Sequence, residues 1–179
     1  MDKRTEIIAG ASRLFEAEGF RGIGIDRIIA PSGASTRTLY KHFGSRDGLV
    51  VAVLEARHRA FMGRLETRPG DIEALFDTLR EWVQEHGALG CMLLRARSEY
   101  AQACNEIVSL VHFQKDEFRR EVAARVQCSL GRSDERLATQ IWLLFEGATA
   151  AASVATASII DDARDAASLL IALARGERS

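Results

Sequence analysis

The chain has 179 residues, 47% hydrophobic and 27% charged, a composition that is typical of a globular protein and excludes a wholly disordered or collagen-like chain. Its 24 Lys and Arg nearly balance its 25 Asp and Glu, but residues 1–60 carry ten basic against seven acidic residues, whereas the remainder carries 14 against 18. The basic N-terminal third therefore indicates a segment that faces a polyanion.

Hydrophobic residues recur at helical spacing near the N-terminus, at Ile7, Ile8, Ala11, Leu14 and Phe15. Gly19 ends this predicted helix. A short helix then covers residues 25–30 and stops at the breaker cluster Pro-Ser-Gly, residues 31–33. A second short helix covers residues 36–42, and Ser45 caps a longer helix that extends to about residue 68.

Pro69-Gly70 is the clearest break in the sequence, and Asp71 opens a helix that ends at Gly87. Further helices are expected at about residues 91–103, 105–129, 134–158 and 162–175. No segment alternates hydrophobic and polar residues as a half-buried strand would. The predicted fold class is therefore all-α, with about nine helices.

The segment from residue 25 to residue 43 has the spacing of a helix-turn-helix, with a tight turn at Gly33 and a second helix that begins after Ser35. That second helix carries the polar or cationic residues Thr36, Arg37, Thr38, Lys41 and His42, while Leu39 and Phe43 can face inward. An α-helix fits the major groove of DNA, and the Tyr40 hydroxyl can reach a phosphate. The alternative is a solvated surface helix, which the spacing, the local excess of Arg and Lys and the position of Tyr40 together disfavour.

Residues 4–56 resemble the N-terminal domain of the TetR family of transcriptional regulators. The matching motifs are Phe15…Gly19-Phe20, Ile25…Ile28, Gly33-x-Ser35, Thr38-Leu39-Tyr40-x-His42-Phe43 and Ser45-Arg46-Asp47-x-Leu49. As a linked set they cover nearly a third of the chain and are more specific than a generic helix-turn-helix pattern. Three residues depart from the family pattern: Pro31 should end or bend the second helix early, Ala34 replaces Val, and Arg46 replaces Lys.

The resemblance implies a cytoplasmic homodimer that binds a palindromic double-stranded DNA operator, acts more often as a repressor than as an activator, and is released by a small-molecule effector. It implies a helix-turn-helix domain at residues 1–45 and a ligand-binding and dimerisation domain at residues 46–179. By this resemblance, base edges and nearby phosphates are contacted by Thr36, Arg37 and Thr38. The DNA backbone is contacted by Ser35, Tyr40, Lys41, His42 and Arg46, and Arg27 on the preceding helix can also reach DNA. Arg37 is the candidate for base readout, because a guanidinium can bind guanine through two hydrogen bonds.

The helices expected at 134–158 and 162–175 are rich in alanine and other small residues, which let helix backbones approach closely. The resemblance assigns them to the dimer interface, where two helices from each subunit form a four-helix arrangement. The alternative is that these residues are intramolecular core.

Candidate ligand-binding residues in the C-terminal part are Trp82, His86, Cys91, Arg95, Tyr100, Phe113, Trp142 and Glu146. An aromatic residue at helical spacing belongs to a hydrophobic core more often than to a ligand site. Glu146 stands alone in an apolar helix, so it either pairs with an arginine such as Arg95 or Arg97 or recognises a cationic ligand. Of these, we prefer the ion pair.

Other classes of protein are less well supported. Cys91, Cys104 and Cys128 are far apart and lack zinc-site spacing, so we expect free thiols in a reducing compartment, with no metal and no cofactor. No glycine-rich phosphate loop follows a strand, and no Ser-His-Asp motif is evident, so an enzyme is not expected. A helical adaptor that does not bind DNA and a regulator that senses oxidants through a cysteine remain alternatives.

The segment from Leu137 to Ile160 is long enough to cross a bilayer, but it contains Glu146 and a second half of Ala, Ser and Thr. We interpret it as a buried helix, and we expect no membrane partner.

Overall fold

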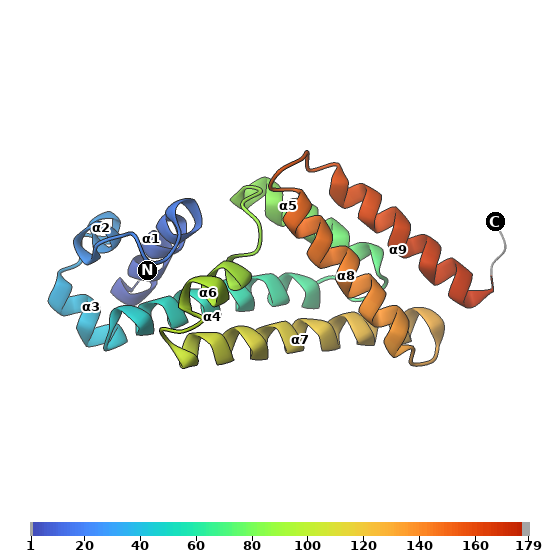
Figure 1. Ribbon diagram of the computed structural model, residues 1–179, viewed down its shortest axis with the longest axis horizontal. Helices are drawn as coiled ribbons and strands as arrows, with labels where there is room; N and C mark the ends of the chain where they lie inside the picture. Colours follow the sequence, from blue (N-terminus) through green and yellow to red (C-terminus); the bar gives the residue numbers. More distant parts are fainter. Residues whose placement is uncertain (1, 177–179) are drawn as a thin grey trace. The chain divides into compact units, whose positions relative to one another are not determined.

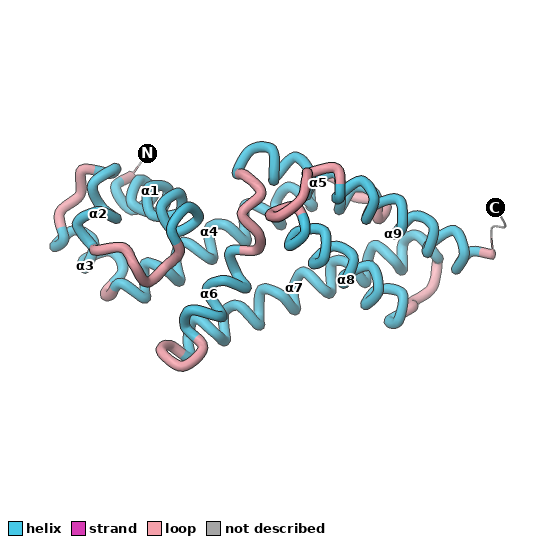
Figure 2. The backbone as a smooth tube through the Cα atoms, turned by 45° about the horizontal axis from the view of Figure 1, so that its top comes forward, coloured by secondary structure: helices cyan, strands magenta, loops and turns pink. Residues whose placement is uncertain are grey.

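The structure is a computed structural model that describes residues 2–176, and within this range it consists of α-helices and one 3-10 turn, with no strands (Figure 1, Figure 2). The elements are α1 (Lys3–Glu18), α2 (Ile25–Ile29), the 3-10 turn η1 (Ala30–Ser32), α3 (Thr36–Phe43), α4 (Arg46–Glu66), α5 (Glu73–His86), α6 (Met92–Tyr100), α7 (Asn105–Leu130), α8 (Glu135–Ala151) and α9 (Ile159–Arg175). The all-α prediction is confirmed. No helix in the described range is both long and apolar enough to cross a membrane.

The structure agrees with one expected helix boundary and differs from another. The helix that contains Pro31 ends early, as predicted: α2 stops at Ile29 and the chain continues as η1, because proline lacks an N–H and cannot extend the helical ladder. The helix expected at 134–158 is shorter than predicted, since α8 ends at Ala151. Beyond it, the backbone continues in turns, with the N–H groups of Ser153 and Val154 donating to the carbonyls of Ala150 and Ala151. The Ser153 hydroxyl also donates to the Ala150 carbonyl, and the hydroxyls of Thr156 and Ser158 bond to each other, so local side-chain hydrogen bonds accompany these turns.

The chain forms two compact units that differ from a simple division in sequence. The N-terminal unit contains the chain up to residue 60 together with residues 92–113, and the C-terminal unit contains residues 61–91 together with the chain from residue 114. The N-terminal unit therefore includes α6 as well as α1 to α3. The expected boundary between a DNA-binding domain at residues 1–45 and a ligand-binding and dimerisation domain at residues 46–179 concerns function, and it stays a prediction.

The core of the N-terminal unit holds the helix-turn-helix in place. Its largest fully buried side chains are Ile7, Phe15, Phe20, Ile28, Leu39, Leu49, Leu54 and Ile107. Leu39 is the buried residue of α3 and Phe43 packs partly buried against the same cluster, so these two side chains fix that short helix to the core while its opposite face stays exposed. Tyr100 of α6 packs edge-on against Phe20, with ring centroids 6.2 Å apart, and joins α6 to the same core.

Helix α6 also binds the end of α1 through polar contacts. The Glu99 carboxylate accepts hydrogen bonds from the backbone N–H groups of Phe20 (2.9 Å) and Arg21 (3.0 Å). Gly19 precedes them at φ +83°, and a Cβ there would lie 2.9 Å from Glu99 Oε1. Glycine is thus needed at this position both for its backbone angle and for the close approach of α6.

The C-terminal unit is built around an aromatic cluster. The Phe118 ring of α7 lies 4.5 Å from that of Phe145 on α8, and Phe61 at the end of α4 contacts both. Helix α9 packs along α8 and against α5. Since α8 and α9 are covered on one side by this core, their other side is the surface on which exposed leucines are found.

Candidate DNA-binding surface and ligand site

Local sequence accounts for the shape of the helix-turn-helix. Gly33 adopts the left-handed conformation (φ +60°) that the tight turn requires. The Ser35 hydroxyl then caps α3 by accepting a hydrogen bond from the backbone N–H of Thr38 at 3.1 Å, and Gly44 ends the helix at φ +71°. The capped turn fixes where α3 begins and so which of its residues point outward.

The polar side of α3 is exposed. Thr36, Arg37, Tyr40, Lys41 and His42 all lie on the surface, while Thr38 is half-buried and shares a hydrogen bond with the Ser35 hydroxyl at 2.9 Å. Exposed cations on a short helix that follows a tight turn suit contact with the phosphates and base edges of a duplex.

Two of the predicted DNA-binding residues are engaged by acidic side chains. Arg27 on α2 is exposed and forms a two-point ion pair with Glu18 at 2.6 and 2.7 Å. The Thr36 hydroxyl, in the first turn of α3, donates to the Asp26 carboxylate at 3.2 Å. Asp26 was not among the residues singled out from sequence, because an acid in the first turn of a helix is most simply explained by the helix dipole.

Arg46 points into the N-terminal unit. Its guanidinium donates to the carbonyls of Phe20 and Ile23 and to the Tyr100 hydroxyl, the last at 2.9 Å. These partners are 23 to 54 residues away in sequence. A phosphate contact for Arg46 stays a prediction, and it would require these internal hydrogen bonds to be released.

The structure separates the candidate ligand residues into two groups. Arg95, Tyr100 and Phe113 belong to the N-terminal unit. Arg95 donates to the carbonyls of Phe15 and Glu16 at the end of α1, and Tyr100 is buried, which raises the pKa of its hydroxyl above the ordinary value. Phe113 is 57% exposed. In this structure Arg95 and Tyr100 thus act within the packing of α6 on the helix-turn-helix.

The other candidates lie in the C-terminal unit, where two of them form a stacked pair. The rings of Trp82 and His86 on α5 are parallel, with centroids 4.1 Å apart, and Phe61 packs edge-on against Trp82 at 5.3 Å. The Arg64 guanidinium covers the Trp82 ring at 4.9 Å. These contacts make Trp82 and His86 part of an aromatic cluster. Residues in such a cluster can belong to a hydrophobic core or contact a ligand.

Glu146 forms an ion pair, but with a partner that the sequence analysis did not name. Its two carboxylate oxygens accept from Lys115 Nζ at 2.6 and 2.7 Å, so the expected pairing with Arg95 or Arg97 is wrong. The two side chains are only 16% and 14% exposed. Burial by itself lowers the pKa of Lys115, but the neighbouring Cys91 and Glu146 outweigh it and the pKa is raised overall. Nothing in the sequence pairs residues 31 positions apart on different helices.

Two further polar groups mark this part of the C-terminal unit. Gln114, next to Lys115 on α7, is 2% exposed, and its amide oxygen has no hydrogen-bond partner among the described residues. Trp142 lies on α8 in a separate shallow hollow between α7 and α8, with Arg119 over its ring at 5.0 Å.

The cysteines have free thiols: Cys91 and Cys104 are half-buried and Cys128 is exposed. Within residues 2–176, no group of three or more His, Cys, Asp or Glu side chains is placed to hold a metal ion.

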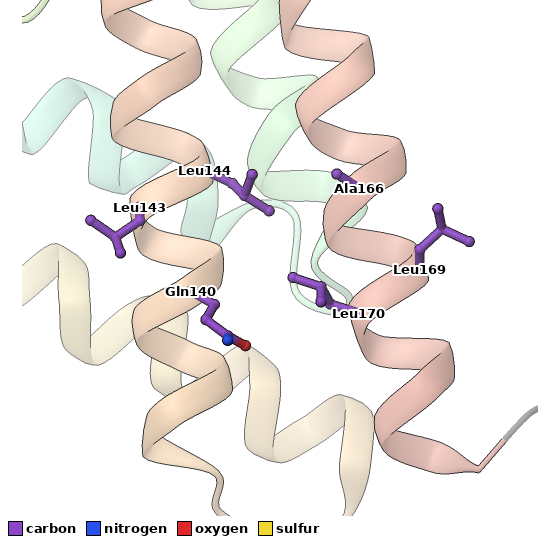
Figure 3. A pocket seen from close by; sticks show the side chains of 6 residues that line it. All are labelled: Gln140, Leu143, Leu144, Ala166, Leu169 and Leu170. Carbon is purple, nitrogen blue, oxygen red and sulfur yellow. The ribbon is translucent and has the colours of Figure 1, made fainter.

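Helices α8 and α9 present an apolar face, formed by Gln140, Leu143, Leu144, Ala166, Leu169 and Leu170. These residues line a shallow hollow of about 530 Å³ in which Leu144 and Leu170 point toward each other between the two helices (Figure 3). Leu143 and Leu169 are 55% and 60% exposed. This α8–α9 face coincides with the helices expected to form the dimer interface.

Comparison with known proteins identifies the family. The sequence profile described as "Bacterial regulatory proteins, tetR family" matches residues 7–53, the segment that forms the helix-turn-helix. The N-terminal domain of the chain therefore belongs to the TetR family.

Curated transcriptional regulators match parts of the chain. The transcriptional regulator LmrA of Bacillus subtilis is 41% identical over 51 residues, which cover 28% of this chain and 27% of LmrA. The aligned region thus spans little more than a quarter of the length of LmrA. The transcriptional repressor BdcR of Escherichia coli is 29% identical over 136 residues, and the alignment covers 69% of each protein.

Solved TetR-family structures match the whole chain. A TetR transcriptional regulator from Chloroflexus aurantiacus superimposes with a TM-score of 0.79 and 25% identity, covering 94% of this chain and 93% of that one. A TetR-family regulator from Streptomyces coelicolor reaches a TM-score of 0.89 at 22% identity, covering 97% and 96% of the two chains. The second of these shows a shared fold across both compact units.

Proposed function

We propose that this TetR-family protein is a cytoplasmic transcriptional regulator, a repressor, that binds a palindromic DNA operator as a homodimer and releases it when a small molecule binds the C-terminal unit. The observation that carries the proposal is the capped, exposed α3, with Arg37, Tyr40 and Lys41 on its outer surface, inside the segment that matches the family. The relatives' names support the same function, since BdcR is a repressor of the helix-turn-helix type.

In the proposed complex, α3 enters the major groove, and its residues contact either base edges or phosphates. Thr36, Arg37 and Thr38, near the N-terminus of α3, contact base edges, and Arg37 binds guanine through two hydrogen bonds. The remaining predicted contacts go to phosphates and are made by Arg27, Ser35, Tyr40, Lys41, His42 and, once its internal hydrogen bonds are released, Arg46. Phosphate contacts supply most of the affinity and make it depend on salt.

The α8–α9 face supports the homodimer. Exposed leucines on two adjacent helices are costly in water, and a second copy of the same face covers them in an arrangement with two-fold symmetry. Two-fold symmetry in the protein requires an inverted repeat in the DNA, because each α3 then reads one half-site.

For the effector, we propose a site in the C-terminal unit near Trp82, His86, Cys91 and Glu146. The C-terminal unit contains both the aromatic stack of Trp82 and His86 and the largely buried ion pair of Glu146 with Lys115, and small-molecule sites use an apolar lining with a few polar groups of this kind. Effector binding shifts the protein toward a state in which the two α3 helices no longer match successive major grooves, and α4, which runs from one compact unit into the other, transmits the change. Coupling of this kind amounts to about 1–3 kcal/mol and acts in both directions.

Selection of duplexes from a random DNA pool by the purified full-length protein, followed by sequencing, tests the proposal. We expect an enriched inverted repeat, with an affinity that falls steeply as salt is raised. A folded dimer that enriches no sequence at low salt would instead support an adaptor that does not bind DNA.

A further inference from the structure

A carboxylate lies at the tip of the surface that we assign to DNA. Asp26 is exposed in the first turn of α2, and its Oδ1 accepts from the hydroxyl of Thr36, the first residue of α3. The other charged side chains exposed nearby on α2 and α3 are the cations Arg27, Arg37 and Lys41. Among the described residues Arg27 is paired with Glu18, so the neighbouring cation does not neutralise Asp26.

The position of this carboxylate needs an explanation beyond the stability of α2. An acid in the first turn favours a helix through its dipole, and that effect needs no contact with α3. Here the hydroxyl of Thr36 holds the carboxylate against the N-terminus of α3, the end of a recognition helix that meets base edges. Near phosphates a carboxylate opposes binding, because like charges repel. Near base edges it can be favourable if a hydrogen-bond donor faces it.

We propose that Asp26 is a specificity-determining residue that accepts a hydrogen bond from the N4 amino group of a cytosine in the major groove, with Thr36 as its positioning residue. This inference rests on the proposed function. In the major groove the base donors are cytosine N4 and adenine N6, and adenine places its acceptor N7 beside N6. Guanine and thymine present acceptors that repel a carboxylate. Cytosine is therefore the base that a carboxylate favours.

Arg37 complements this reading. It follows Thr36 directly on α3, and guanine, the base opposite cytosine, offers the two acceptors O6 and N7 that a guanidinium binds. An acceptor from α2 and a donor from α3 thus suit C·G pairs, on the same or on neighbouring steps of the half-site. A surface with cations alone would read such a pair through its guanine only.

The test repeats the selection from a random pool with four full-length proteins: the wild type, Asp26→Ala, Asp26→Asn and the control Glu66→Gln, which removes an exposed charge at the end of α4. We expect the wild-type half-site to contain a cytosine whose replacement lowers affinity about 10-fold. Asp26→Ala should lose the preference at that position and keep the others. Asp26→Asn should shift it to adenine, since an amide pairs with both N6 and N7.

Binding to unrelated DNA gives a second readout. Both Asp26 variants should bind random duplexes more tightly than the wild type at low salt, because a charge that faces the DNA has been removed, whereas Glu66→Gln should leave this affinity unchanged. An operator that is identical for the wild type and Asp26→Ala overturns the inference alone. If the Asp26 variants lose affinity equally whichever base of the operator is considered, and their melting temperature is lowered, the inference is also overturned in favour of a structural role for Asp26. A wild type that enriches no sequence overturns the proposed function and the inference with it.

Discussion

Arg37 and Tyr40 are both exposed on α3, yet their chemistry assigns them different tasks. Arg37→Ala should remove a two-point contact to guanine and lower the preference for operator over random DNA by about 10-fold. Tyr40→Phe keeps the ring and removes the hydroxyl, so it should weaken binding to all sequences about equally. Fluorescence anisotropy with operator and random duplexes measures both effects. An equal loss on the two duplexes for Arg37→Ala would contradict base readout by this residue.

In the proposed complex, the ion pair between Arg27 and Glu18 would compete with DNA for the same guanidinium. Its two hydrogen bonds must be exchanged for a phosphate contact if Arg27 is to bind the backbone. Exposed pairs of this kind contribute on the order of 0.2–1 kcal/mol, so Glu18→Gln should raise DNA affinity about 2- to 5-fold at low salt. Filter binding over a salt series measures this. Glu66→Gln serves as the charge control, and an unchanged affinity for Glu18→Gln would indicate that Arg27 does not reach DNA.

At the scale of single helices, local sequence was a good guide where the determinants are close together. Ser35, Gly33 and Pro31 each act within a few residues through a cap, a turn and a missing N–H, and the start of α3 and the end of α2 follow from them. The end of α8 was missed, because an alanine-rich segment reads as helix until its hydroxyl side chains form their own hydrogen bonds.

Helix α6 shows what a helix gains from tertiary contacts. Glu99 satisfies two backbone N–H groups after α1 from 78 and 79 residues away. Glu99→Ala would leave those donors without a partner at a cost of about 2 kcal/mol, a fall in melting temperature of roughly 4–8 °C. Circular dichroism during heating measures it. Ser98→Ala, the exposed neighbour on α6, is the matched control and should melt like the wild type, and a Glu99→Ala protein that does the same would show that these bonds do not stabilise the fold.

At the scale of the whole molecule, the α8–α9 face should determine the oligomeric state. Leu143→Glu combined with Leu169→Glu places charges on both helices of a surface that a second copy would bury, and a buried unpaired charge is very costly. The double variant should be a monomer in analytical ultracentrifugation at micromolar concentration and should lose operator binding. Leu94→Glu, at an equally exposed leucine of α6, is the control. A double variant that remains a dimer would place the interface elsewhere.

The sequence by itself determined the fold class, the position of the helix-turn-helix and the outward face of α3, because each depends on residues within one or two helical turns. Only the tertiary structure decided the fate of the isolated charges. Arg46 turned out to bind carbonyls inside its own unit, Glu146 paired with Lys115 rather than with an arginine, and Asp26 met Thr36. Hydrogen bonds and ion pairs act only at short range, so which charges meet depends on the packing of separate helices, and hydrophobic periodicity along the chain does not encode that choice.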